Sequence, residues 1–263
     1  MKAIDQEIKF LSQNYLNDKC LFELSEESDE SAEESDGTKL CDFKPYDSNE
    51  LFQFVDTNGV IVCWFKDKYS DYISRNIDTI IIQNTNIKSM TVKYLSSLGV
   101  ETVLYTLTNN DEHEIRIYLN SKVDTTKITF EITDVFEGTY IYIGQLRVCE
   151  SIIDLVATTE TTARNSVQDG QVRTYGGRLI TWTDYYKWAA TIQIQNNSKT
   201  QYDLLKSFII ADGFVTVIPW EDFEERDVYE VAISLKDLNF DINRWSGLYN
   251  LTLNAEAQEN ASY

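Results

Sequence analysis

His113 is the only histidine of the chain, and it is the first residue to consider for catalysis. A serine or cysteine nucleophile usually needs an imidazole base, which a single histidine can supply at one place only. His113 lies in the run Asp111-Glu-His-Glu114, between a predicted turn and a predicted strand. We therefore expect an exposed histidine at the start of a strand, without a catalytic role.

The four cysteines are widely separated in the sequence and form no CxxC pair. A zinc site needs clustered thiolates or imidazoles, so this spacing predicts no metal centre. The cysteines, which we expect to be buried or idle thiols of a reducing compartment, are Cys20, Cys41, Cys63 and Cys149. The glycine pair Gly176–Gly177 lacks the other glycines and the Lys-Ser/Thr of a phosphate loop, and we expect no cofactor.

Carboxylate pairs are the next candidates for chemistry: Asp134 with Glu137, Glu221 with Asp222, and Glu224 with Glu225. A glycosidase needs two carboxylates across a cleft, one of them with a raised pKa. In a chain with 43 acidic residues such pairs occur by chance, and their spacing shows neither a cleft nor a raised pKa. The sequence therefore predicts a protein that is not an enzyme.

Four aromatic residues fall within seven positions: Trp182, Tyr185, Tyr186 and Trp188. A flat row of aromatic rings can stack on sugar rings, which would make a carbohydrate-binding face. The alternative is that some of the four fill the core while the others pack at a subunit interface, where tyrosine and tryptophan are enriched. The sequence leaves both interpretations open.

The chain has a net charge of -20 at pH 7. Nucleic-acid binding depends on lysine and arginine, so this charge argues against it. It also argues against an anionic membrane surface, and no apolar run reaches the ~20 residues of a membrane span. The segment Glu23–Asp36 holds eight acids and no base. It predicts a solvated loop, or alternatively a loose cation site or an acidic contact to a neighbouring subunit through Glu26, Glu27, Asp29, Glu30, Glu33 and Glu34.

Short strands account for most of the chain after residue 50. The segment Ile77–Tyr94 predicts two paired strands with a polar break at Asn84–Asn86. Asp56-Thr-Asn-Gly59 predicts a hairpin turn between strands at 51–55 and 60–65. Further strands are expected at 103–107, 115–119, 128–132 and 140–148. Evenly spaced strands joined by polar turns indicate an antiparallel β-sandwich over residues 50–156.

The flanking regions complete a mainly β protein. Residues 1–49 predict an arm that carries the acidic insertion at 23–36, and the apolar spacing in 3–17 favours a short helix or a docking arm. Residues 157–170 are polar without a period and predict a linker or an extended arm. Residues 171–263 predict a smaller β-rich domain with one helix, which begins at the capping box Ser198–Gln201.

The order of these segments resembles a known family. Trp64, the apolar run 77–82, Asn84-Thr-Asn-Ile87 and the closing strand 139–146 are similar to the discoidin or galactose-binding-like jelly roll of some bacteriophage tail proteins. Arg173–Arg178, followed by Tyr185–Trp188 and Ser198–Phe208, is similar to the C-terminal parts of such proteins.

The resemblance implies a structural virion protein of a phage, a prophage or a gene transfer agent, made in the bacterial cytoplasm and built into a tail tip, baseplate or tail adaptor. Its partners would be other tail or baseplate proteins, with copies of the chain forming a ring. The resemblance implies no sugar-binding residues. The alternative is a carbohydrate-binding module that recognises a glycan on a host surface.

Overall fold

A computed structural model describes residues 2–3, 7–17, 19–25, 37–41, 51–67, 69–158, 161–173, 179–212, 214–219, 228–233, 238–242 and 246–260. The chain divides into two compact units. The sandwich unit spans 14–150, and the sheet unit comprises 1–13 with 151–263. The predicted boundaries, 1–49, 50–156, 157–170 and 171–263, differ from these. They cut through the N-terminal part of the sandwich unit and assign the first strands of the sheet unit to a separate arm.

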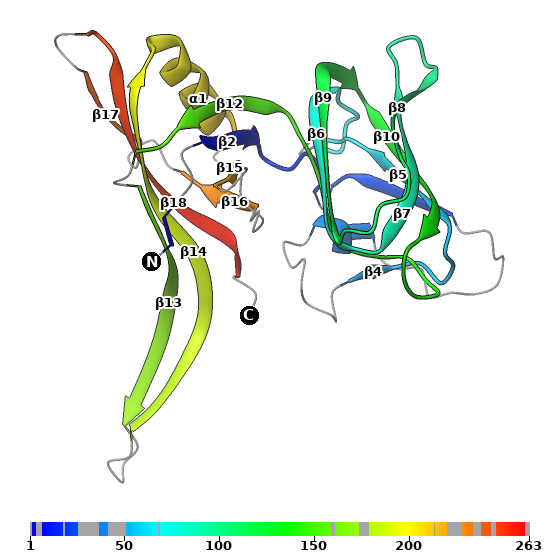
Figure 1. Ribbon diagram of the computed structural model, residues 1–263, viewed down its shortest axis with the longest axis horizontal. Coiled ribbons are helices and arrows are strands. Elements are labelled where there is room, and N and C mark those ends of the chain that lie inside the picture. The colour runs from blue at the N-terminus through cyan, green and yellow to red at the C-terminus, as the bar shows by residue number, and fades with distance from the viewer. Residues whose placement is uncertain are drawn as a thin grey trace. The chain divides into compact units, whose positions relative to one another are not determined.

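The sandwich unit has two antiparallel sheets around one core (Figure 1). One sheet has the strand order β3-β5-β10-β7-β8 and the other has the order β4-β11-β6-β9. Their elements are β3 (Leu21–Ser25), η1 (Gly37–Cys41), β4 (Phe52–Gln53), β5 (Gly59–Trp64), β6 (Arg75–Thr85), β7 (Ile87–Leu95), β8 (Glu101–Leu107), β9 (Glu114–Thr125), β10 (Lys127–Val135) and β11 (Tyr142–Cys149). The prediction of a mainly β protein with an antiparallel sandwich is therefore confirmed.

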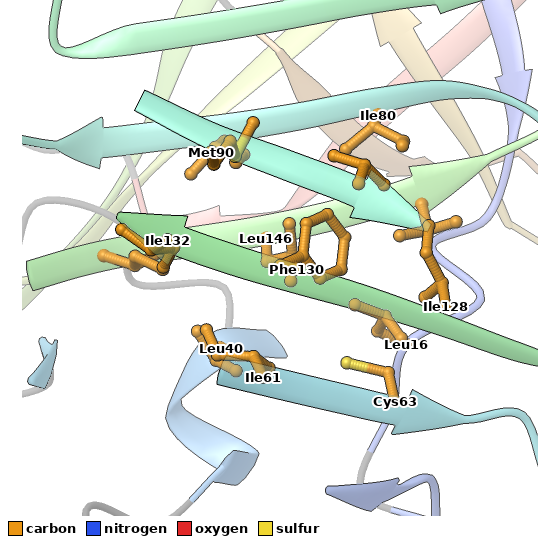
Figure 2. Packing of buried hydrophobic residues seen from close by; sticks show 14 of the residues in the cluster. Leu16, Leu40, Ile61, Cys63, Ile80, Met90, Ile128, Phe130, Ile132 and Leu146 are labelled. Carbon is orange, nitrogen blue, oxygen red and sulfur yellow. The ribbon is translucent and has the colours of Figure 1, made fainter. Parts of the chain in front are cut away.

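Alternating side chains from both sheets meet in the core of this unit. Ile61, Phe130 and Met90 come from the first sheet, and Ile80 and Leu146 come from the second (Figure 2). Burial of these apolar side chains holds the two sheets together.

The predicted pairing of the two strands within Ile77–Tyr94 is wrong. β6 pairs with β9 and β11, whereas β7 pairs with β8 and β10. The chain turns at Asn86 and passes from one sheet to the other, and Asn84 has a φ of 51° directly before this turn. The alternation correctly indicated strands, but it holds no information about which strand lies beside which.

The predicted hairpin at Asp56–Gly59 is also wrong. β4 pairs with β11, and β5 pairs with β3 and β10. Gly59 meets a steric need there: a Cβ atom at this position would lie 2.7 Å from the ring of Phe54. The glycine allows close packing, and it does not form a two-residue turn.

The sheet unit contains a nine-stranded sheet with the order β1-β13-β14-β18-β16-β15-β2-β12, in which β17 also pairs with β18. Its elements are β1 (Lys2–Ala3), β2 (Glu7–Ser12), β12 (Ser151–Val156), β13 (Thr162–Arg173), β14 (Leu179–Asn197), α1 (Lys199–Asp212), β15 (Phe214–Ile218), β16 (Tyr229–Ala232), β17 (Leu238–Ile242) and β18 (Tyr249–Asn260). Helix α1 packs on the sheet through Tyr202, Leu205 and Ile209.

The predicted start of the helix is confirmed. The Ser198 hydroxyl accepts a hydrogen bond from the Gln201 amide at 3.2 Å, and the Gln201 side chain accepts one from the Ser198 amide at 2.8 Å. These two bonds are the capping box that the sequence predicted.

The predicted helix within residues 3–17 is wrong. Residues 7–12 form β2, which lies between β15 and β12 with Ile8 and Phe10 fully buried. Two neighbouring strands satisfy the main chain of β2 on both edges, which outweighs a weak helical spacing. Since β2 and β12 pair with each other, the sandwich unit is an insertion between two adjacent strands.

The predicted linker at 157–170 is wrong as well, because residues 162–173 form β13. β13 pairs with β14 along its whole length, whereas β18 pairs with β14 only from Lys187 onward. Between Val167 and Tyr186 at its base and Arg173 and Leu179 at its end, the two strands form a ribbon that pairs with no other described strand (Figure 1). Main-chain hydrogen bonds pair the two strands, and such bonds are available to any sequence, so the strand gives no apolar period to detect.

Candidate functional site

Loops from both sheets meet at one end of the sandwich unit. We call this end the rim and define it as residues 54–58, 85–86, 108–113 and 136–142. Main-chain hydrogen bonds tie the loops together: the Thr85 amide donates to His113, the Phe136 amide donates to Asn86, and the Ile141 amide donates to Asp56, each at 3.0 Å. The rim therefore brings together side chains that lie far apart in the sequence.

Asn86 fixes the loop between β10 and β11. Its side-chain nitrogen donates to the carbonyl oxygens of Glu137 and Tyr140, both at 2.8 Å, and its side-chain oxygen accepts from the Tyr142 amide at 3.0 Å. Asn86 is buried, so these bonds have little competition from water. The polar break predicted at Asn84–Asn86 contains the last two residues of β6 and Asn86, where the chain passes to β7, and Asn86 in addition positions the neighbouring loop.

A chain of polar contacts runs across this loop. The Tyr142 hydroxyl donates to Glu137 Oε1 at 2.7 Å and lies 3.2 Å from His113 Nδ1. Burial raises the pKa of the Tyr142 hydroxyl, and the hydrogen bond to the Glu137 carboxylate raises it further. Tyr142 therefore stays protonated at neutral pH and holds one oxygen of Glu137 in place.

His113 has a defined tautomer in this arrangement. Its Nδ1 lies 3.0 Å from the carbonyl oxygen of Thr85, which can only accept a hydrogen bond. Nδ1 must therefore carry the proton, and in the neutral ring Nε2 is left as an acceptor. The imidazole packs edge-on against Phe136 with ring centroids 5.1 Å apart, and more than half of its side chain is exposed.

Tyr140 adds an aromatic surface to the rim. Its side chain is 41% exposed, and its ring centroid lies 6.3 Å from that of Tyr142. The exposed ring thus lies next to the tyrosine whose hydroxyl contacts the Glu137 carboxylate and the His113 imidazole. This combination can bind a ligand that has an apolar face and a polar edge.

The residues that the sequence indicates as contact residues lie outside the rim or outside the described part of the structure. Trp188 lies in β14 and is buried in the core of the sheet unit, so it cannot stack on a ligand. The main chain of Trp182, Tyr185 and Tyr186 pairs with β13, but their side chains lie outside the described part of the structure. The acidic residues Glu26, Glu27, Asp29, Glu30, Glu33 and Glu34 also lie outside the described residues.

The described residues give little indication of reactive thiols, a metal site or a membrane-spanning helix. All four cysteines are buried and none is part of a disulfide, and burial raises the pKa of the Cys63 thiol. Within the described ranges, no group of three or more His, Cys, Asp or Glu side chains could hold a metal ion. In the same ranges, no helix is both long and apolar enough to cross a membrane.

Sequence reasoning missed the rim because its residues had local explanations. His113 fits an exposed histidine beside a turn, Glu137 fits a chance carboxylate, and Tyr140 and Tyr142 fit ordinary strand residues. The signal that could have selected them is the Tyr-Ile-Tyr alternation just after a short loop with Glu137 and Gly138. Only the fold shows that His113 belongs to the same surface.

No protein-family model matches the chain, and no curated protein matches it significantly. Among solved structures, the chain is similar to the family 32 carbohydrate-binding module of Streptococcus pneumoniae EndoD, with a TM-score of 0.43 and 12% identity over 52% of this chain and 99% of the module. It is also similar to the family 32 module of Clostridium perfringens NanJ in complex with galactose, with a TM-score of 0.37 and 17% identity over 54% of this chain and 99% of that chain.

A third similar structure is a histidine mutant of the lectin binding domain of Lectinolysin complexed with Lewis b, with a TM-score of 0.40 and 14% identity over 53% of this chain and 97% of that chain. None of the three is described as a virion component. The β-sandwich assignment rests on the strand order itself.

Proposed function

We propose that the sandwich unit is a carbohydrate-binding module and that the rim is its binding site. One observation carries the proposal: the exposed ring of Tyr140 lies beside Tyr142, whose hydroxyl contacts both His113 and Glu137. The proposal excludes Trp188 as a glycan-contact residue, because Trp188 belongs to a core.

A sugar ring fits these groups chemically. One face of a pyranose is made of C–H groups, and it can stack on the ring of Tyr140, with a gain of about 0.5–1.5 kcal/mol from the aromatic contact. Sugar hydroxyls can donate to the second oxygen of Glu137 and to His113 Nε2, for which the described residues provide no donor. A hydroxyl next to the C–H face would thus be recognised by an acceptor next to the ring.

We propose further that the site binds its sugar without cleaving it. Glycoside hydrolysis needs a carboxyl group with a raised pKa as the general acid. The predicted partner of Glu137, Asp134, has the opposite property: Lys88 lies 2.8 Å away, and its hydrogen bond lowers the pKa of the Asp134 carboxyl. The other two carboxylate pairs, at 221–222 and 224–225, lie outside the described residues.

Glycan binding can be tested on an array, followed by calorimetric titration of the sugars that bind. Tyr140→Ala should lower affinity about two- to tenfold, since it removes the stacking surface. Tyr118→Ala is the matched control, because Tyr118 is also 41% exposed but lies within β9 opposite Thr79. Equal affinity for the wild type and Tyr140→Ala would exclude the rim as the site, and an array without any bound glycan would exclude the function.

We keep assembly into a phage or phage-like particle as a second proposal. It is supported by the β13–β14 ribbon, whose outer edges pair with no other described strand and could pair with another subunit. The ribbon can be shortened by replacing residues 168–185 with Asn-Gly, because Val167 and Tyr186 are direct partners. Sedimentation and electron microscopy should show rings for the wild type and smaller species for the shortened chain. A wild type that stays monomeric at high concentration would refute this role.

A further inference from the structure

Strand β8 (Glu101–Leu107) is an open edge of the sandwich unit. It is the last strand of its sheet and pairs with β7, and no other described strand lies along its second side (Figure 1). The main-chain groups on the outer side of an edge strand can form ladder hydrogen bonds with another extended strand. The natural occupant of this edge is therefore a further β-strand.

The hairpin that contains β8 is apolar at its surface. Four apolar side chains, each more than a third exposed, lie at its turn and on the strand: Leu98, Val100, Val103 and Tyr105. From residue 95 to residue 110, Glu101 is the only charged residue, although 25% of the chain is charged. Glu101 forms an ion pair with Lys127 of β10, so its charge is compensated within its own sheet. The edge thus offers apolar contacts and little net charge.

The other edge strands of the sandwich unit differ from β8. The described strand β9 carries four charged side chains, and β4 has only two residues. β3 contains Glu23 and continues in the sequence into the acidic run that ends at Asp36. Charged side chains on an edge oppose pairing with another chain, and very short edge strands offer few hydrogen bonds. Among these four edges, β8 is the one best suited to receive a strand.

A bulge in β8 decides which side chains share a face. Tyr105 pairs with Val92 and Val103 pairs with Lys93, which leaves Leu104 without a partner in β7. Val92 is a core residue and Leu104 packs against the same core, so Leu104 and Tyr105 lie on the core-facing side of the sheet although they are adjacent in sequence. Val103 lies on the opposite side with Lys93. Two large apolar side chains therefore stand next to each other at the open edge.

We infer that β8 pairs antiparallel with β8 of a second copy of this chain, about a two-fold axis between Leu104 and Tyr105. With this axis, Leu104 lies opposite Tyr105 of the second copy and Val103 lies opposite its Thr106. Thr106 pairs with Thr91, next to the core residue Val92, so it shares the outer face with Val103 and like faces meet throughout.

Charge favours this site for contact between two copies. Each copy carries a net charge of -20, so two copies repel each other over most of their surface. In the antiparallel register Glu101 lies at the far end of the pair, opposite Thr108 of the second copy, so no like charges meet across the axis. The strand is therefore complementary to itself in both its apolar pattern and its charge.

Antiparallel pairing also sets the direction of the two rims. β8 leads into rim residues 108–113, so the rims of the two copies lie at opposite ends of the joined sheet. Under the carbohydrate-binding function proposed above, one dimer would bind sugars on two separate surfaces. The pairing itself does not depend on that function.

Sedimentation equilibrium of the full-length chain tests the pairing. A single seven-residue strand buries little surface, so the wild type should show a monomer–dimer equilibrium at micromolar concentration. The dimer should become tighter as sodium chloride is added, because salt screens the repulsion between the two acidic copies. Val103→Lys should weaken the dimer about tenfold or more, because it places a charge on each side of the axis.

Val156→Lys is the matched control for this variant. It changes the net charge by the same amount at an exposed valine of β12, with 63% exposure against 55% for Val103, and it should leave the dimer unchanged. The chain with the shortened ribbon should also dimerise like the wild type, because its β8 is intact. Dimers formed through β8 are thereby distinguished from assemblies formed through the ribbon.

Paired cysteines test the register. In the double variant Val103→Cys/Thr106→Cys, each new thiol lies opposite the other new thiol on the second copy, within reach of a disulfide. Diamide, which takes up the two thiol hydrogens as the sulfur–sulfur bond forms, should link the double variant into covalent dimers on a non-reducing gel. Val103→Cys alone should stay unlinked, because residues 103 of the two copies are offset by three positions, about 10 Å along the strands.

The outcomes separate the dimer from the carbohydrate site. A wild type that stays monomeric at high micromolar concentration, or a Val103→Lys variant that dimerises as tightly as the wild type, would overturn the pairing. Dimers of the double variant that diamide does not link would overturn the antiparallel register. Because none of these assays contains a sugar, a monomeric wild type leaves glycan binding at the rim standing, and an empty glycan array leaves the dimer standing.

Discussion

Replacement of Asn86 by alanine is the sharpest test of how the rim is held. The change removes two hydrogen bonds donated to the carbonyls of Glu137 and Tyr140 and one accepted from the Tyr142 amide. Each such bond contributes about 1 kcal/mol net, and a buried group left without a partner costs about 1–3 kcal/mol. We expect Asn86→Ala to lower the free energy of unfolding of the sandwich unit by about 3 kcal/mol.

Hydrogen exchange measured by mass spectrometry, together with urea unfolding, would report this loss. Trp64 is the only tryptophan between residues 14 and 150, so its fluorescence change is expected to follow the sandwich unit. Asn110→Ala serves as the control: it also removes two side-chain bonds, to Ile87 and Glu112, but the second is exposed, and it should cost about 1 kcal/mol.

Faster exchange in the peptide that contains Tyr142, together with a lower urea midpoint, is the expected result for Asn86→Ala. Asn86→Ala would contradict the argument if it unfolded at the same urea concentration as the wild type and if the peptide containing Tyr142 kept its wild-type rate of hydrogen exchange. It would mean that the β10–β11 loop keeps its conformation without Asn86, and that the positions of Glu137 and Tyr140 have another cause.

Three further predictions concern stability. Trp188→Ala should destabilise the sheet unit by about 3–5 kcal/mol in thermal unfolding while glycan binding at the rim persists, because Trp188 fills a core; lost binding with unchanged stability would restore it as a contact residue. Ser198→Ala should lower the free energy of unfolding, measured with urea, by about 1 kcal/mol, because it removes the helix cap. Lys88→Met should destabilise the sandwich unit at pH 7 but not at pH 2. The pKa of Asp134 is lowered in the folded state, so its stabilising effect is present above the unfolded pKa and is lost as pH falls through the folded pKa, below about pH 4. A stability difference that is the same at both pH values would show that Asp134 does not cause it.

Local signals predicted the elements whose causes are local. The capping box at Ser198 and the apolar positions Tyr202, Leu205 and Ile209 lie within one helix, so the sequence alone located α1. The prediction of a helix where β2 lies is wrong for the opposite reason. Its strand conformation depends on β12 and β15, whose residues are far away in the chain. Helical spacing of a few apolar residues cannot outweigh pairing on both edges of a strand.

The candidate site likewise depends on contacts between residues far apart in the chain, which local signals do not reveal. His113, Glu137, Tyr140 and Tyr142 each have an ordinary local explanation, and none forms a motif with its sequence neighbours. They meet because Asn86, at the turn from β6 to β7, binds the loop that follows β10. No spacing in the sequence encodes that contact. The aromatic row at 182–188 did form a local pattern, but Trp188 in it packs into a core.

The sequence by itself determined the acidic charge, the abundance of strands, the helix near residue 200 and the absence of the spacings that common catalytic and metal motifs require. These properties depend on composition and on short-range periodicity. The tertiary structure alone decided that β6 and β7 lie in different sheets, that residues 162–173 form a strand, and that the rim gathers His113, Glu137 and Tyr140. An alternating pattern states which face of a strand is buried, but main-chain hydrogen bonds are alike in every sequence, so the choice of neighbour depends on packing across the whole unit.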